Sequence, residues 1–272
     1  MRLIKKINFK HHQNLMEDEG DILKAREYFF KKKNKNLYCL LKNRFDWINN
    51  FVEKNDKVIE LGSGTSFLKS FITKNEVKTS DLTDYYFLDY KKIDACNTGF
   101  PDNSFDKVVS SNLIHHIAYP TIHFEEVYRI LKPGGLYIIQ DINCSLACQL
   151  VVMLMRHEGF DFTKDVTNRE IPCNLPEDPW SANIAIPNLI FEDYEKFNKQ
   201  LNFKFELIYK KNSEFLLFLN SGGVIAKTVH IPLNDFLNDI IKNIDKIFTK
   251  FPKLFAMQSS IVLKKPNKEQ RN

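Results

Sequence analysis

A short apolar strand that ends in two closely spaced glycines is the feature that most constrains this chain. Residues 58–65 read Val-Ile-Glu-Leu-Gly-Ser-Gly-Thr, and residues 67–72 continue with apolar side chains at helical spacing. Gly62 and Gly64 let the backbone turn tightly and approach a ligand where a Cβ atom would collide with it. The stretch therefore predicts the first strand, turn and helix of a nucleotide-binding α/β domain.

Two residues around this turn narrow the kind of ligand. Phe67 stands where the dinucleotide fingerprint Gly-x-Gly-x-x-Gly has its third glycine, which lets a helix pack closely beside a pyrophosphate. Glu60 places a carboxylate just before the turn, and a carboxylate repels phosphate. Both residues argue against a pyrophosphate ligand, and the carboxylate suits a cationic or amino-bearing ligand such as S-adenosylmethionine (SAM).

Apolar strands alternate with helical segments beyond the turn. Strands are predicted at residues 76–80, 107–111 and 136–140, and a helix at 124–131 ends at a Lys-Pro-Gly-Gly sequence. The alternation predicts an α/β fold with a doubly wound, mostly parallel sheet. Asp81 ends the second strand about 20 residues beyond the glycine turn, where such folds bind ribose hydroxyls.

Residues 58–141 resemble a class I SAM-dependent methyltransferase. The matching pieces, in order, are Glu60–Gly64, Asp81, Asp94-Ala95, Phe100–Val109, Asn112–His116 and Leu131–Gly135. The resemblance implies a seven-stranded, Rossmann-like sheet that binds SAM. The cofactor-binding residues that it implies are Glu60, Gly62, Ser63 and Gly64 for the amino-acid part, Asp81 for the ribose, Asp94 and Ala95 for the adenine, and Asn112 for the methionine moiety.

The chain as a whole also resembles bacterial methyltransferases that are associated with surface-polysaccharide biosynthesis. This second resemblance is carried by residues 178–183 and 221–227. It implies a small-molecule or sugar acceptor, such as a glycan precursor, that is methylated on oxygen or nitrogen. The identity of the acceptor and the choice among oxygen, nitrogen and carbon stay open.

At 272 residues the chain fits one elaborated α/β domain. The expected parts are an N-terminal helical cap at 1–54, a SAM-binding core at 55–145, a helix and lid segment at 146–200, a C-terminal completion of the sheet at 201–265 and a disordered tail at 266–272. Strands are predicted at 203–209 and at 258–264, and the family resemblance implies that the last one is antiparallel.

Composition and charge limit the possible partners. No apolar run is long enough to span a bilayer and the N-terminus lacks the apolar core of a signal peptide, which predicts a cytoplasmic protein without stable membrane insertion. Five scattered cysteines without a Cys-x-x-Cys pair predict reduced thiols and no metal site. The net charge of +5 comes without a basic-aromatic ladder, so no nucleic-acid surface is predicted. The oligomeric state stays open.

Acceptor specificity is expected outside the sheet. Residues 165–188 hold four prolines and Trp180 with little periodicity, which is typical of a lid or binding loop. The same pattern fits a segment that has only a structural role equally well. As a lid, the segment would place Trp180 and Asn183 on the acceptor. His157 is a further candidate, because it ends a predicted apolar helix at 145–157 with polar residues.

Two apolar helices are predicted to pack in the core. The first is the helix at 145–157, and the second is a long amphipathic helix at 233–255. For the second helix, contact with a membrane or another subunit is the alternative.

His116 is the candidate catalytic base. It follows the fourth predicted strand, and an imidazole with a pKa near neutrality can take a proton from a hydroxyl or a protonated amine. A buried structural histidine is the alternative. The competing functions are a non-enzymatic SAM-binding protein and an NAD-dependent oxidoreductase, which Phe67 and Glu60 disfavour. Asn112-Leu113-Ile114-His115 stands where enzymes that methylate the amino groups of nucleic-acid bases carry an Asn-Pro-Pro-Tyr type sequence.

Overall fold

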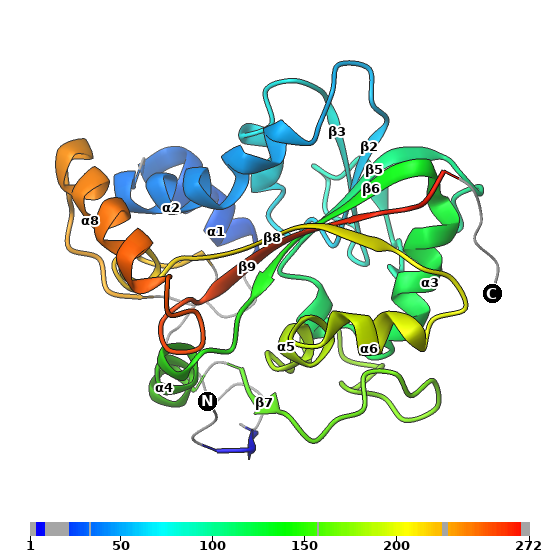
Figure 1. Ribbon diagram of the computed structural model, residues 1–272. Helices are drawn as coiled ribbons and strands as arrows, with labels where there is room; N and C mark the ends of the chain where they lie inside the picture. Colours follow the sequence, from blue (N-terminus) through cyan, green and yellow to red (C-terminus); the bar gives the residue numbers. More distant parts are fainter. Residues whose placement is uncertain (1–3, 9–21, 33, 157, 225–227, 268–272) are drawn as a thin grey trace.

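The computed structural model describes residues 4–8, 22–32, 34–156, 158–224 and 228–267 (Figure 1). The α-helices are α1 (Ile22–Lys32), α2 (Lys35–Phe45), α3 (Pro120–Ile130), α4 (Leu146–Met155), α5 (Ile186–Phe191), α6 (Tyr194–Lys199), α7 (Leu216–Leu219) and α8 (Asp235–Phe248). Short 3-10 helices are η1 (Asp46–Asn50), η2 (Phe67–Ser70) and η3 (Ile114–His116). The strands are β1 (Lys6–Ile7), β2 (Val58–Leu61), β3 (Val77–Asp81), β4 (Tyr90–Lys91), β5 (Phe105–Ser111), β6 (Leu131–Ile142), β7 (Phe160–Asp161), β8 (Glu206–Ser213) and β9 (Gln258–Lys264).

Seven strands form one sheet in the order β4-β3-β2-β5-β6-β9-β8. The strands from β4 to β6 are mutually parallel, whereas β9 runs antiparallel to both of its neighbours, β6 and β8. The predicted α/β fold with a mostly parallel seven-stranded sheet is confirmed. The strand predicted at 203–209 lies slightly later, at β8, and β1 pairs with β7 in a separate small sheet.

The order of the sheet reverses at β2. The chain runs outward from β2 through β3 to β4, and β5 then pairs with the other side of β2. In open α/β sheets, ligands bind beyond the carboxyl ends of the strands at such a point, because the two connections diverge there. The loops that hold Gly62 and Asn112 begin at this point of the sheet.

Successive residues of the central strands pack on opposite faces of the sheet. Val108 and Ile139 belong to a cluster that includes α3, α5 and α6. Val109 and Ile138 belong to a second cluster that includes α1, α2, η1 and η2. Because both faces are covered, these strands read as continuous apolar runs rather than as alternating ones.

The helix predicted at 67–72 is only the single turn η2. β3 begins at Val77, so a short loop is all that separates them. The side chain of Asn49 fixes this loop by accepting from Thr73 N and donating to Phe71 O, each at 2.9 Å. Helix α1 covers the same face, where the rings of Phe29 and Phe67 lie 4.4 Å apart.

The predicted C-terminal helix is too long, since α8 spans Asp235–Phe248 instead of 233–255. Asn234 begins it by accepting a hydrogen bond from Leu237 N. Pro252 prevents a longer helix, because it lacks an amide proton and its ring would collide with the carbonyl of Phe248. The prediction of core packing is also wrong for much of this helix: Phe236 is 71% exposed and Ile247 is 61% exposed.

The apolar helix predicted at 145–157 is α4. Its core prediction is wrong for the outer side, where Leu150 is 46% and Leu154 is 77% exposed. No helix among the described residues is both long enough and apolar enough to cross a bilayer. His157 and residues 268–272 of the predicted tail lie outside the described residues.

A buried ion pair joins the second helix to the far edge of the sheet. Arg44 in α2 donates from Nη2 to Glu214 Oε2 at 2.6 Å and from Nε to Oε1 at 3.1 Å. The two side chains are 5% and 0% exposed. The pair is bidentate, which fixes the angle between α2 and the connection that follows β8.

Candidate active site

Gly62 and Gly64 form a left-handed turn at the end of β2, with φ angles of +67° and +44°. A Cβ atom on Gly62 would lie 2.6 Å from Cδ1 of Leu113, so the turn touches the loop that follows β5. A Cβ atom on Gly64 would lie 3.7 Å from Cδ1 of Ile22, and beyond its chain neighbours no other atom of the described residues lies within 4 Å of it.

Ser63 stabilises this turn through hydrogen bonds of its hydroxyl and its amide. Its hydroxyl donates to the Glu60 carbonyl at 3.2 Å and accepts from Ser80 N at 3.1 Å. Its own amide donates to the Ser80 carbonyl at 2.9 Å. Ser63 thus ties the end of β2 to the end of β3 and fixes the path of the two glycines.

Glu60 carries an unusual buried carboxyl group. The residue is 2% exposed, and its Oε2 has no hydrogen-bond partner among the described residues. Burial raises the pKa of Glu60 to about 8; the polar side chain of Ser63 nearby opposes the rise and the charge of Asp81 adds to it. A buried acceptor without a donor costs about 1–3 kcal/mol, so the position suits a ligand that brings a cationic donor.

Asp81 lies at the end of β3, beside the same turn. Its Oδ2 accepts from Gly64 N at 2.8 Å, and its Oδ1 accepts from the amide and hydroxyl of Thr83 at 3.0 and 2.9 Å. A carboxylate offers about four acceptor positions, so these contacts leave room for a further donor.

Asp94, Ala95 and Asn112 lie along the neighbouring loops. Ile93 N donates to the Asp81 carbonyl at 2.9 Å, which places Asp94 next to the end of β3. Asp94 is exposed and Ala95 is buried. Asn112 follows β5 with φ +51°, and its Oδ1 accepts from Gln258 at 3.0 Å. The loops that hold the predicted cofactor residues therefore follow the carboxyl ends of β2, β3 and β5.

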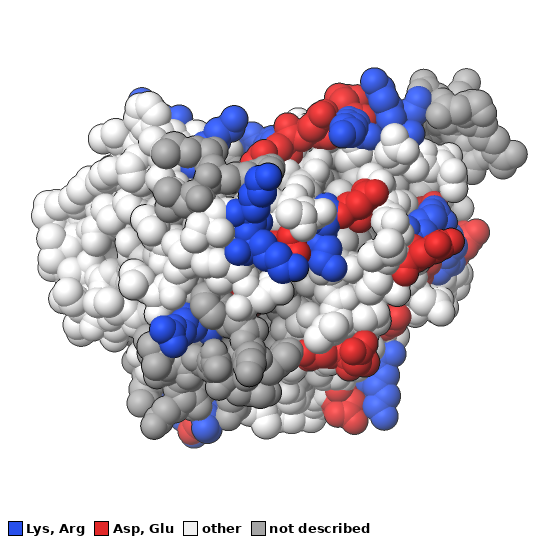
Figure 2. Space-filling model, turned by 90° about the horizontal axis from the view of Figure 1, so that it is seen from below, with Lys and Arg blue, Asp and Glu red and all other residues white. Residues whose placement is uncertain are grey.

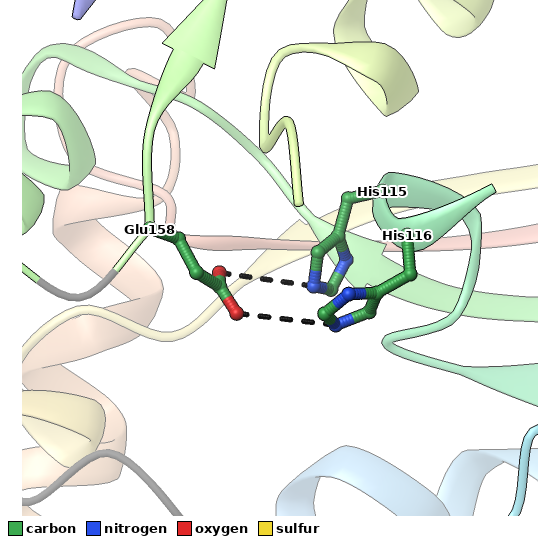
Figure 3. Close-up of side chains that lie close together, drawn as sticks. All are labelled: His115, His116 and Glu158. Carbon is green, nitrogen blue, oxygen red and sulfur yellow. Dashed lines mark ion pairs between the residues drawn. The ribbon is translucent and has the colours of Figure 1, made fainter. Parts of the chain in front are cut away.

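Next to this group, η3 presents two histidines to a glutamate. Glu158, which follows α4, has one carboxylate oxygen 3.8 Å from Nε2 of His115 and the other 3.9 Å from Nε2 of His116. Figure 3 shows the two rings and the carboxylate pointing toward one another. Both separations are too long for a direct hydrogen bond.

The outer nitrogens of the two rings are held by other groups. His115 Nδ1 lies 2.6 Å from Asp141 Oδ1, and the other oxygen of Asp141 accepts from Ile114 N at 2.7 Å. His116 Nδ1 lies 3.2 Å from the Ser181 carbonyl. A carbonyl only accepts, so Nδ1 of neutral His116 is assigned the proton, which leaves the lone pair of Nε2 on the Glu158 side.

The two histidines have opposite electrostatic surroundings. Burial alone would lower the pKa of His115, but Asp141 and Glu158 outweigh it and raise this pKa to about 10. Burial and the charge of His115 together lower the pKa of His116 to about 4. At neutral pH the site holds a charged His115 beside a neutral His116, which differs from the near-neutral pKa expected for His116.

The same three side chains have the spacing of metal ligands. One ligand atom from each of His115, His116 and Glu158 lies within 4.8 Å of the others. Imidazole nitrogen and carboxylate oxygen are ligands for divalent ions such as zinc. This cluster is the group among the described residues that could hold a metal ion.

The predicted lid segment packs directly against η3. Asn183 N and Asn174 Nδ2 both donate to the His115 carbonyl, at 2.9 and 2.8 Å. Trp180 is 41% exposed. Asn183 is 4% exposed, and its Oδ1 accepts from the amides of Asp161 and Ala185, so this side chain holds the local backbone.

Sequence reasoning gave no role to two charged residues of the site. Arg26 in α1 donates to the Thr65 carbonyl, and its guanidinium carbon lies 3.7 Å from the ring centre of Phe87. No sequence pattern singles it out. One feature of the sequence points to Glu158, which is the sudden run of polar residues at the end of an apolar helix.

Residues 60–139 match the family described as "Methyltransferase domain". The chain is 31% identical over 108 residues to a highly reducing polyketide synthase of Calcarisporium arbuscula, covering 40% of this chain and 4% of that protein. It is 44% identical over 50 residues to the sterol 24-C-methyltransferase of Pneumocystis carinii, covering 18% of this chain and 13% of that protein. The chain thus spans only a small part of the length of these curated relatives.

A similar solved structure is described as "Complex between the Haloferax volcanii Trm112 methyltransferase activator and the putative methyltransferase". The similarity covers 92% of this chain and 99% of that one, with 14% identity and a TM-score of 0.50. At this level of sequence identity, the similarity shows only that the two chains share a fold. Residues 60–139 are thus identified as a methyltransferase domain, and the sheet that contains them has the Rossmann-like methyltransferase fold.

Proposed function

We propose that this protein transfers the methyl group of SAM to a small-molecule or glycan-precursor acceptor. The observation that carries the proposal is the buried Glu60 carboxyl next to the glycine turn, which has an oxygen that receives no hydrogen bond from the part of the chain that the structure describes. The ammonium group of the methionine part of SAM would supply that donor. SAM is a sulfonium compound, and when bound it supplies an activated methyl group for direct displacement.

The cofactor would lie across the carboxyl ends of β2, β3 and β5. Gly62, Ser63 and Gly64 would line its amino-acid part together with Glu60, and Arg26 would pair with its carboxylate. Asp81 would bind the ribose hydroxyls, Asp94 and Ala95 would flank the adenine, and Asn112 would lie beside the methionine moiety. This assignment is supported by the order of these loops around the point where the sheet reverses.

His116 would take the proton of the acceptor on Nε2. The ring is oriented for this step by the Ser181 carbonyl, which occupies Nδ1. Glu158, at 3.9 Å, would stabilise the imidazolium that forms. His115 would act as a positioning residue, because Asp141 holds it in place and its charge keeps His116 neutral until the acceptor arrives. The acceptor would be a hydroxyl or a protonated amine, in keeping with O- or N-methylation.

The segment 165–188 would close over the acceptor. Its hydrogen bonds to the His115 and Ala118 carbonyls support this role, because they place it beside the predicted base. Trp180 would stack on the acceptor, for example on a sugar, and exclude water from the methyl group. Asn183 would contribute to the acceptor site by holding this lid in place through its hydrogen bonds to the Asp161 and Ala185 amides. Such an acceptor would fit a cytoplasmic protein that takes part in polysaccharide biosynthesis.

A SAM-binding protein without catalysis is the second candidate function. The neutral His116 and its carboxylate partner favour an enzyme, since a pure binding protein needs neither. NAD binding is the less favoured alternative, because Phe67 stands where the dinucleotide fingerprint has its third glycine.

Replacement of Asp81 by alanine should weaken SAM binding by about 10–100-fold. The physical reason is the loss of charge-assisted hydrogen bonds to the ribose, which contribute about 1.5–3 kcal/mol. Calorimetry with SAM and with NAD measures both affinities. Thr83→Val is the matched control, because it removes one hydrogen bond of Asp81 and keeps the carboxylate. Unchanged SAM affinity in Asp81→Ala, or NAD binding as tight as SAM binding, would contradict the proposal.

SAM binding should release a proton from Glu60. Its pKa of about 8 means that the free protein holds a neutral carboxyl at pH 7, and a bound ammonium group requires the carboxylate. Affinity should therefore rise by up to about tenfold per pH unit as the pH approaches 8 from below, and then level off. Titration calorimetry in buffers of different ionisation enthalpy counts the proton. Glu60→Gln is the control, since it keeps the titration of the amino group of SAM and loses that of the protein; equal proton release in both proteins would exclude Glu60 as the ammonium partner.

A further inference from the structure

The rings of His115 and His116 are both held through Nδ1. Nδ1 of His115 lies 2.6 Å from Asp141 Oδ1, and Nδ1 of His116 lies 3.2 Å from the Ser181 carbonyl oxygen. Histidines that bind a metal ion almost always donate their other ring nitrogen to a carboxylate or a backbone carbonyl, which fixes the ring and its tautomer. Both rings therefore have the orientation of metal ligands, with Nε2 as the ligand atom.

Glu158 faces the two Nε2 atoms from the segment that follows α4 (Figure 3). Its two oxygens lie 3.8 Å from Nε2 of His115 and 3.9 Å from Nε2 of His116. Zinc bonds to nitrogen and oxygen are about 2.0–2.2 Å long, so the ligand atoms of a tetrahedral site lie about 3.4 Å apart. A shift of about half an ångström, which small rotations of these side chains provide, brings the carboxylate to that spacing.

The backbone that carries the two histidines is fixed by its own hydrogen bonds. Asp141 Oδ2 accepts from Ile114 N at 2.7 Å. The His115 carbonyl accepts from Asn183 N at 2.9 Å and from Asn174 Nδ2 at 2.8 Å. An ion therefore finds η3 already in place, and little conformational freedom is lost when it binds.

The charges of the cluster suit a divalent cation. Asp141 and Glu158 supply two carboxylates, which together balance an ion of charge +2 between neutral imidazoles. Burial opposes a proton on His115, but these carboxylates outweigh it and raise the pKa of this ring to about 10, so an ion displaces a proton here. The side chains of His116 and Glu158 are 21% and 16% exposed, which lets an ion enter from solvent.

Exposed carboxylates are poorer ligands for such an ion. On the face shown in Figure 2, acidic side chains lie close to Lys and Arg side chains, which compete with an ion for them. Carboxylates without imidazole also favour hard ions such as magnesium and calcium, whereas imidazole favours zinc and similar transition metals. Two imidazoles and one carboxylate therefore select a transition metal.

We propose that His115, His116 and Glu158 bind one divalent transition-metal ion, such as zinc, per chain. Three protein ligands leave the fourth position of a tetrahedral ion to water or to another small ligand. The binding of the ion does not depend on methyl transfer. An ion on Nε2 of His116 occupies the lone pair that the proposed base uses, so zinc should inhibit methyl transfer; only this consequence rests on the proposed function.

Titration of the metal-free full chain with cobalt(II) and zinc tests the proposal. Tetrahedral cobalt(II) absorbs visible light, so the wild-type protein should develop this absorption, saturate at one ion per chain and lose it when zinc is added. An excess of magnesium should not displace the cobalt. Binding by any of the five cysteines would add a strong near-ultraviolet sulfur band, which should not develop.

Substitutions in the cluster should weaken zinc binding, as calorimetry measures it. Asp141→Asn should cost about 10–100-fold in affinity, the loss expected when a group that orients a ligand is removed. His116→Ala and Glu158→Gln each remove a ligand atom, so their losses should be at least as large. His230→Ala is the matched control, because it removes an exposed imidazole outside the cluster and should leave zinc affinity unchanged.

Thermal midpoints of metal-free His116→Ala and Glu158→Gln should agree with that of the wild type, which separates ligand loss from unfolding. Three results would overturn the proposal: a wild-type protein that binds neither ion, a His116→Ala or Glu158→Gln protein that binds zinc as tightly as the wild type, or a sulfur band that accompanies cobalt binding. Tight zinc binding without inhibition of methyl transfer would support the metal site and contradict His116 as the base.

Discussion

Replacing His116 by alanine should lower kcat by about 10²–10⁴-fold and leave the affinity for SAM almost unchanged. The factor is that expected for loss of a positioned general base. SAM affinity should survive because His116 is not among the predicted cofactor contacts. Single-turnover rates with labelled SAM, once an acceptor is found, measure the effect.

The pH profile separates this base from an ordinary histidine. Because the pKa of His116 is lowered to about 4 and that of His115 is raised to about 10, kcat/KM for the acceptor at saturating SAM should stay flat between these values. A histidine with its usual pKa would give a rise near pH 6.5. Exposed His230 provides the control substitution His230→Ala. Near-normal turnover of His116→Ala would return this residue to a structural role.

The largest expected effect on stability comes from Glu214→Ala. The substitution leaves the Arg44 guanidinium, 5% exposed, without its bidentate partner. Breaking a buried pair in this way costs about 3–5 kcal/mol, a large share of the roughly 5–15 kcal/mol that stabilises a folded domain. Denaturant unfolding, followed by circular dichroism, measures the loss.

Two further variants show whether the buried charge is the cause. Arg44→Met combined with Glu214→Leu should recover most of the stability, because no unpaired charge remains. Asp235→Ala removes the exposed ion pair with Lys35 and should leave the unfolding midpoint nearly unchanged. A Glu214→Ala protein as stable as Asp235→Ala would refute the account.

Local chemistry made the core of the fold predictable. The strands β2 and β9 and the turn at Gly62 and Gly64 follow from short apolar runs and from residues that only certain turns accept. The parallel sheet then follows from the alternation of strands and helices.

The features that the sequence did not reveal depend on contacts between residues that are far apart in the chain. The apolar stripes of α4 and α8 read as core, because a hydrophobic pattern does not tell which side of a helix meets protein. Glu158 meets the two histidines only after α4 and the sheet are in place. The length of η2 depends on how soon β3 begins, and Asn49 decides this from another part of the chain.

The position of β9 has a consequence for the order of events during synthesis. This strand is made after all the others described here, yet it lies between β6 and β8. While residues 258–264 are still inside the ribosome, β6 has an open edge and β8 has no partner. The residues of β2, β3 and β5 leave the ribosome long before that, but their sheet can be completed only when β9 inserts. Long-range pairing of this kind is slow and an open strand edge invites aggregation, so the risk of aggregation is highest in the interval before β9 emerges.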